Sequence, residues 1–142
     1  MSQSLPSSTI DRGLLLIRLA LGLVFTLHGW MKLTVLGVTG TAGFLGQLGV
    51  PLPGVNAVVL IALELVGGLM LALGAGTRVV GALLAFSMFV ATVAAHGANG
   101  FYLPSGYEFT LTLTMVTLAI VLTGAGRYSL DARLFRRQAA VR

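Results

Sequence analysis

The chain has 142 residues, of which 56% are hydrophobic and only 9% are charged, with a formal net charge of +5. Soluble domains average about 25% charged residues, so the composition excludes an ordinary soluble enzyme, a disordered tail and a nucleic-acid-binding protein. The chain has no cysteine, which excludes disulfides, thiol chemistry and an iron–sulfur cluster held by thiolates.

Four apolar runs can cross a bilayer as helices, which takes roughly 20 residues each. They cover residues 13–36, 55–73, 79–95 and 109–123. Segments rich in glycine and proline separate them at residues 49–54, 74–78 and 99–106. Because these connections are short, we expect antiparallel neighbours and an all-α, up-and-down four-helix bundle in the membrane, forming one domain over residues 1–142.

The first apolar run carries Arg18, His28 and Lys32 and lacks the small-residue cleavage site of a signal peptide. We therefore interpret it as a retained membrane span. Residues 37–48 follow it with a weak helical stripe of apolar side chains, which predicts a short helix at the outer surface.

The placement of lysine and arginine predicts the orientation of the spans. If both termini and the 74–78 turn share one side, the other side carries only Lys32. The first side then carries Arg12, Arg18, Arg78, Arg127, Arg133, Arg136, Arg137 and Arg142. Cytoplasmic loops are enriched in positive charge, so both termini are predicted to be cytoplasmic.

A short amphipathic helix is expected from Ser129 to Arg137, with Ser129 as its N-cap and Asp131 in its first turn. Leu130, Leu134 and Phe135 would then face the membrane surface while the arginines meet lipid headgroups. Docking of a partner protein is the alternative role for this segment.

Six ionisable groups lie within or at the ends of the spans. They are Arg18, His28, Lys32, Glu64, His96 and Glu108. A charge at the bilayer centre costs at least ~2.5–3.5 kcal/mol, so such groups normally face the bundle interior and find partners. At about 100° per residue, the three groups of the first span point the same way, together with two glycines that permit close helix approach.

Glu64 is the one carboxylate deep in a span, roughly 13 Å from the outer face. It can form a structural pair with Arg18 or Lys32, or such a pair can be part of a functional polar pocket in the outer half of the bundle. We favour the pocket and add His96 and Glu108 to it, although both can also serve as interfacial residues that reach water. No metal-ligand spacing links these groups, and paired haem ligation by His28 and His96 is disfavoured.

The segment Arg18-Leu19-Ala20-Leu21-Gly22, followed by His28-Gly29-Trp30-Met31-Lys32-Leu33, resembles the first helix of DoxX-family membrane proteins. Residues 64–68 (Glu-Leu-Val-Gly-Gly), with Thr77-Arg78 after them, resemble the second helix and its exit turn. Residues 124–131 are similar to the closing segment of the family, with Ala125 where proline is frequent. The small bacterial inner-membrane branch of the family is the most similar.

This resemblance implies a multi-pass protein of the bacterial inner membrane whose motif positions are Arg18, His28, Lys32 and Glu64. Family relatives include membrane subunits of thiosulfate:quinone oxidoreductase, and others are linked to oxidative or thiol stress. The expected function is thus a subunit or accessory of a quinone-linked redox system, with a quinone as ligand, a redox partner protein and no self-sufficient catalytic motif. The lack of cysteine argues against direct handling of sulfur by this chain.

Two alternatives remain from other classes of protein. The first is a small transporter or exporter, which would have to form a homo-oligomer because four helices make a thin wall for a pore. The second is a non-catalytic anchor that recruits a soluble enzyme through residues 127–142.

Overall fold

The computed structural model describes residues 7–134, and every regular element in that range is helical. The elements are α1 (Ser7–Met31), the π-helical turn η1 (Lys32–Leu36), α2 (Gly37–Gln47), α3 (Pro53–Ala62), the π-helical turn η2 (Leu63–Gly67), α4 (Gly68–Leu73), α5 (Thr77–Val90), the π-helical turn η3 (Ala91–Ala95), the 3₁₀ turn η4 (Gly97–Asn99) and α6 (Glu108–Thr123). Residues 130–134 form a further helical turn. The predicted all-α class is confirmed for this part of the chain.

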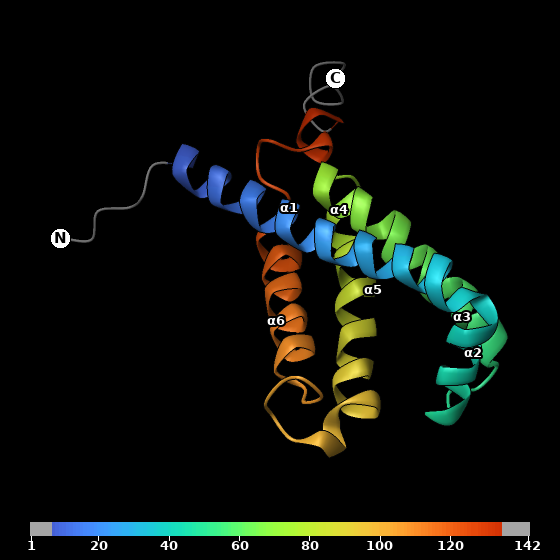
Figure 1. Cartoon of the computed structure of the whole chain (residues 1–142). Helices are drawn as coiled ribbons and strands as arrows, with labels where there is room; N and C mark the ends of the chain where they lie inside the picture. The colour runs from blue at the N-terminus through green and yellow to red at the C-terminus, as the bar shows by residue number, and fades with distance from the viewer. Residues whose placement is uncertain (1–6, 135–142) are drawn as a thin grey trace.

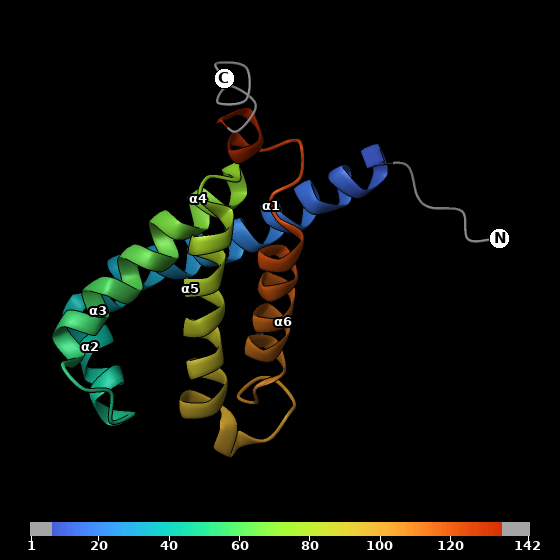
Figure 2. The same ribbon diagram turned by 180° about the vertical axis from the view of Figure 1, so that it is seen from behind.

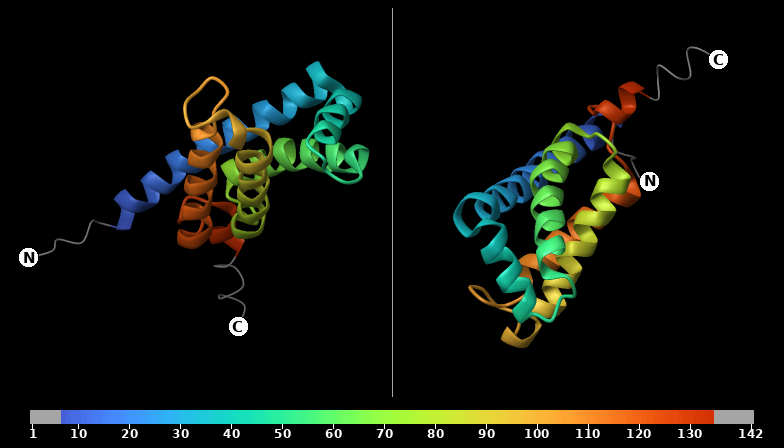
Figure 3. Two further views of the ribbon diagram at one scale, coloured as in Figure 1. Left: turned by 90° about the horizontal axis from the view of Figure 1, so that it is seen from below. Right: turned by 90° about the vertical axis from the view of Figure 1, so that its right-hand side faces the viewer.

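Two pairs of helices cross each other, as Figure 1 shows. α1 packs along α4 and η2, and α5 packs along α6. Figure 2 shows from behind that α5 and α6 lie across α1, and Figure 3 shows the same crossing from below and from the side. The up-and-down topology and the cytoplasmic location of both termini stay predictions.

Three helical stretches are long and apolar enough to cross a membrane, and α6 is a shorter apolar helix. The stretches are Ser8–Gln47, Pro53–Leu73 and Thr77–Ala95. They contain the first three predicted runs, and α6 corresponds to the fourth. The first stretch is much longer than predicted because the helical path continues through η1 into α2, the short helix expected at residues 37–48.

Gly37, the first residue of α2, has φ +67°, a conformation that glycine adopts easily. Helix α2 then packs against α3.

Glycines allow α1 to touch η2 and α4 backbone to backbone. A Cβ atom on Gly22 would lie 2.6 Å from Cβ of Ala72, and one on Gly29 would lie 2.5 Å from the backbone nitrogen of Leu65. A Cβ atom on Gly68 would lie 2.7 Å from the backbone nitrogen of Thr26. Residue numbers rise along α1 as they fall along the partner, so the two helices are antiparallel. Small residues at such a contact favour helix association inside a membrane.

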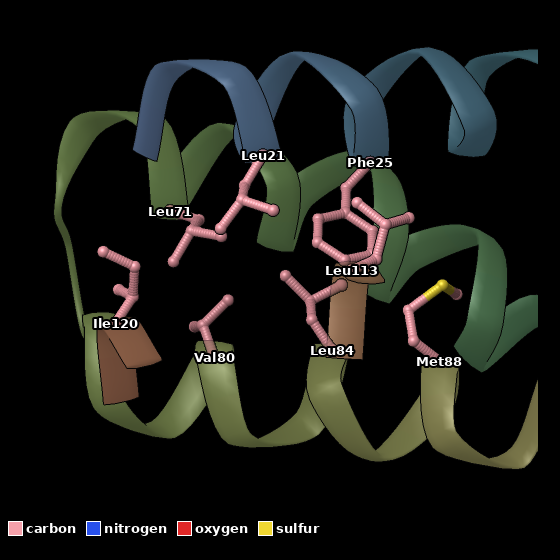
Figure 4. Packing of buried hydrophobic residues seen from close by; sticks show 8 residues of the cluster. All are labelled: Leu21, Phe25, Leu71, Val80, Leu84, Met88, Leu113 and Ile120. Atoms are coloured by element: carbon pink, nitrogen blue, oxygen red, sulfur yellow. The ribbon is translucent and has the colours of Figure 1, made fainter. Parts of the chain in front are cut away.

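The hydrophobic core lies between the two helical pairs (Figure 4). Its buried members are Leu21, Phe25, Leu71, Val80, Leu84, Met88, Leu113 and Ile120. The outward-facing side chains are also apolar: Leu16, Phe86 and Leu122 are 67%, 66% and 80% exposed. A surface of this kind is expected to contact lipid, since soluble proteins rarely expose large contiguous apolar patches.

Candidate functional site

An ion pair joins the first two membrane-spanning stretches. Nζ of Lys32 donates to Oε2 of Glu64 at 2.6 Å, and the two side chains are 16% and 2% exposed. Gly29 lies close to Lys32 along the chain, and its contact with Leu65 brings the two backbones close enough for this bond. Of the two pairs that the sequence left open for Glu64, the structure forms the one with Lys32.

Burial makes this pair chemically important. Removing two charges from water costs several kcal/mol per ion, so each charge depends on its partner. An ammonium group carries three donors and a carboxylate accepts several hydrogen bonds. The 2.6 Å bond uses one of these donors, and the described residues provide no second hydrogen bond to either charged group. The pair therefore retains hydrogen-bonding capacity for a ligand.

His28 and Phe109 lie next to this pair. His28 lies near the end of α1, four residues before Lys32, the first residue of η1. The ring centroids of His28 and Phe109 are 6.1 Å apart, with an interplanar angle of 32°. The structure therefore brings three of the six predicted residues together, and it adds Phe109, which the sequence analysis did not single out.

Both members of the ion pair lie in π-helical turns. Lys32 begins η1, and Glu64 is the second residue of η2. Such turns interrupt the regular α-helical hydrogen bonding and often occur at functional sites. No pattern in the sequence signalled them, because spacing arguments assume a constant 100° per residue.

Arg18 lies elsewhere, and the expectation that it extends toward Glu64 is wrong. Its side chain is fully buried, and Nη2 donates to the backbone oxygen of Tyr128 at 2.6 Å. Arg18 precedes Lys32 by 14 positions, which is about 21 Å along a helix. The Tyr128 carbonyl and the nearby charge of Asp131 hold the guanidinium beside the α4–α5 turn, away from Lys32 and Glu64.

Asp131 joins the closing segment to the start of α5. Its carboxylate accepts hydrogen bonds from the backbone N–H groups of Gly76 at 2.7 Å and Thr77 at 2.9 Å. Burial raises the pKa of Asp131, but the N–H groups of Thr77 and Gly76 and the charge of Arg18 outweigh this effect and leave the pKa below its ordinary value. Asp131 therefore caps a helix that is distant in sequence.

Ser129 is the N-cap that the sequence predicted, since its Oγ accepts a hydrogen bond from the backbone N–H of Ala132 at 3.1 Å. Leu130 and Leu134 are exposed, as an amphipathic surface helix requires. The remainder of that predicted helix, with Phe135, Arg136 and Arg137, lies outside the described residues, as does Arg142.

His96 and Glu108 close the loop between α5 and α6. Nδ1 of His96 donates to the backbone oxygen of Ser105 at 2.9 Å, and Oε1 of Glu108 accepts from the backbone N–H of Leu103 at 2.9 Å. Within residues 7–134, neither forms a hydrogen bond or ion pair with Lys32 or Glu64. Their local partners assign them a part in the loop and do not bring them to the Lys32–Glu64 pair. No cluster of three or more metal-ligating side chains occurs in the same range.

Fold and site together define an all-helical membrane protein with a buried lysine–glutamate pair between its first two spanning stretches. Residues 13–97 match the DoxX family, and the chain belongs to that family. The predicted resemblance is confirmed.

Relatives of similar length support this assignment. The chain is 34% identical over 130 residues to "Putative oxidoreductase CatD" of Bacillus subtilis, covering 92% of each protein. It is 31% identical to "Inner membrane protein YqjF" of Escherichia coli, over 89% of this chain and 95% of that protein. It is 29% identical to "Inner membrane protein YphA" of the same organism, over 84% of this chain and 89% of that protein. No solved structure matches the chain. Apolar helices and these relatives support a location in the bacterial inner membrane.

Proposed function

We propose that this protein is a membrane subunit or accessory of a quinone-linked redox system, in which His28, Lys32 and Glu64 bind the quinone headgroup. The observation that carries the proposal is the buried 2.6 Å pair between Lys32 and Glu64, with His28 four residues before Lys32 along the helical path. Ionisable residues inside membranes commonly mark functional sites. The relative named as a putative oxidoreductase supports the redox assignment.

The three side chains match the chemistry of a quinone headgroup. Its carbonyl oxygens accept hydrogen bonds, which the remaining N–H donors of Lys32 and a ring N–H of His28 can supply. Reduction to the quinol adds two electrons and two protons. Glu64 can accept and release a proton beside Lys32, and a redox partner protein would supply the electrons.

The proposed orientation places this site in the outer half of the bilayer. With four antiparallel spans and cytoplasmic termini, Lys32 lies near the outer end of the first span, and Phe109 lies at the outer end of the fourth. The site then faces the apolar phase in which membrane quinones dissolve.

Quinone binding can be measured through Trp30, the only tryptophan of the chain. Trp30 lies two residues from both His28 and Lys32 and is 55% exposed, so a quinone bound nearby should quench its fluorescence. In lipid nanodiscs we expect a short-chain ubiquinone to give saturable quenching. Glu64→Gln should weaken the binding about tenfold, because it leaves the Lys32 charge without its partner.

Glu108→Gln is the matched control for this experiment. Its carboxylate serves the α5–α6 loop, and the amide oxygen can still accept the bond from Leu103. Quenching that rises linearly with quinone concentration in the wild type would show only partitioning into lipid and would contradict the proposal. Equal quinone binding by the Glu64→Gln and wild-type proteins would show that the ion pair has no part in binding the quinone.

Transport is the second candidate, and the same buried ion pair favours it, because charged groups in membranes also line ion pathways. Movement of protons or solute in liposomes that requires both Lys32 and Glu64 would support transport. A partner-recruiting anchor depends on residues 127–142, and residues 135–142 of that segment lie outside the described range.

A further inference from the structure

The aromatic pair formed by His28 and Phe109 connects the two crossing helical pairs. His28 belongs to α1, and Phe109 is the second residue of α6. Their ring centroids lie 6.1 Å apart at a tilt of 32°, within the range of favourable aromatic contacts. Phe109 nevertheless remains 38% exposed. Part of this aromatic surface is therefore open to another molecule.

The exposed fractions of the Lys32 and Glu64 side chains also indicate the direction from which a ligand reaches the ion pair. Glu64 is only 2% exposed, whereas Lys32 is 16% exposed. A molecule can therefore contact Lys32 and the exposed His28 before it reaches the carboxylate. Leu27, Trp30 and Met31 on the same stretch of α1 are 55%, 55% and 41% exposed. Apolar side chains of this kind face lipid, so lipid surrounds the stretch of α1 that carries His28 and leads into Lys32.

We propose that a flat, conjugated headgroup enters from the lipid, packs against Phe109 and His28, and directs its carbonyl oxygen to Lys32. Phe109 is then a positioning residue that selects aromatic or quinonoid rings over aliphatic lipids. This inference rests on the proposed function, because it assigns the ring-binding surface of the same site. Charge and hydrogen bonding come from Lys32 and Glu64, whereas ring selectivity comes from Phe109.

Conservative substitutions at Phe109 distinguish the effect of its aromatic ring from the effect of its size. Phe109→Leu keeps an apolar side chain but removes the ring, and Phe109→Tyr keeps the ring. Aromatic contacts contribute modestly, so we expect Phe109→Leu to weaken saturable quenching of Trp30 by a short-chain ubiquinone about three- to tenfold. Phe109→Tyr should bind within about twofold of the wild type.

Leu118→Ala is a control for general damage to α6, since Leu118 is an apolar residue of the same helix with 41% exposure. It should leave quinone binding unchanged. Thermal unfolding of each variant in detergent checks that Phe109→Leu remains folded, and recovery of binding in Phe109→Tyr excludes a purely structural effect.

The outcomes separate the two proposals. Saturable binding that Phe109→Leu leaves unchanged would overturn the role of Phe109 and leave the quinone site intact. If wild-type quenching is never saturable, the quinone site and the role of Phe109 are both overturned. Equal competition by a long-chain aliphatic alcohol and by the quinone would show a general lipid groove and contradict ring selection.

Discussion

Single glycines set the distance between α1 and the η2–α4 stretch, and through it the geometry of the ion pair. Gly29 lies against the backbone of Leu65, which is next to Glu64, and it precedes Lys32 by three positions. A larger residue would push the two helices apart at the level where the 2.6 Å bond forms. Packing of the smallest residue thus supports the chemistry of two long side chains.

Gly29→Ala should therefore destabilise the protein. The added Cβ would meet backbone atoms at 2.5 Å, which a side-chain rotation cannot relieve. Overpacking of this kind typically costs about 1–3 kcal/mol. We expect a lower midpoint of thermal unfolding in detergent, measured by circular dichroism.

Gly13→Ala is the matched control on the same helix, because no atom beyond its own turn of the helix lies within 4 Å of a Cβ at that position. It should leave the midpoint unchanged or raise it slightly, since alanine favours helix. A Gly29→Ala protein as stable as Gly13→Ala would show that α1 and η2 are not in close contact at Gly29.

At the scale of whole elements, helix α5 is capped by a residue from outside its own sequence neighbourhood. The carboxylate of Asp131 accepts hydrogen bonds from the backbone N–H groups of Gly76 and Thr77. Its own backbone N–H donates to the backbone oxygen of Gly74 at 2.8 Å. Arg18 of α1 adds a positive charge to the same junction. Three elements therefore meet at the α4–α5 turn.

Loss of this cap should destabilise the protein in a pH-dependent way. Asp131→Ala should lower stability at neutral pH by about 0.5–2 kcal/mol, the usual effect of removing a helix cap. Because the pKa of Asp131 in the fold lies below its ordinary 3.8, its contribution is present above about pH 3.8 and is lost as the pH falls through the lowered value. The difference between wild type and variant, measured by unfolding at neutral and strongly acidic pH, should therefore shrink in acid.

Asp131→Asn tests the charge separately, since asparagine keeps an acceptor oxygen and does not ionise. Its stability should fall between those of the wild type and Asp131→Ala at neutral pH. A difference between wild type and Asp131→Ala that stays constant down to acidic pH would contradict an ionised cap.

For the whole molecule, the decisive property is the orientation of the crossing helical pairs in the membrane. The arginine-rich ends and the single lysine near the opposite end predict cytoplasmic termini. The loop between α5 and α6 would then face outward, and the closing segment with Asp131 would face the cytoplasm.

Cysteine labelling can test this orientation without background, since the chain has no cysteine of its own. Ser105→Cys in the α5–α6 loop should react with a membrane-impermeant maleimide on spheroplasts. Thr9→Cys near the start of α1 should react only after the membrane is permeabilised. Both positions are exposed, so burial does not explain a difference between them. The reverse labelling pattern would invert the proposed topology and place the site in the inner half of the bilayer.

Much of the candidate site could be predicted from the sequence because bilayer physics restricts it strongly. The cost of a charge in lipid required Glu64 to find a partner, and helical spacing put His28 and Lys32 on one face of the first span. The structure forms the Lys32–Glu64 pair. The same reasoning could not choose between Lys32 and Arg18, because the angular position on a helix does not give the depth at which a second helix crosses it.

The sequence also could not predict the hydrogen-bond partners of His96 and Glu108, for a related reason. His96 and Glu108 lie at the correct ends of their helices, but short loops offer nearby backbone partners, and Ser105 and Leu103 take them. Phe109 had no charge or motif to mark it. Its contact with His28 exists only because α6 lies across α1.

The sequence by itself determined the membrane class, the apolar helices, the face of the first span that carries charge and the family. These follow from hydropathy and helical period, which act along the chain. Tertiary structure alone decided which cation neutralises Glu64, that Arg18 and Asp131 meet at the α4–α5 turn, and that Phe109 contacts His28. Such pairings depend on the register and crossing of helices distant in sequence, which are set by contacts such as that of Gly29 with Leu65.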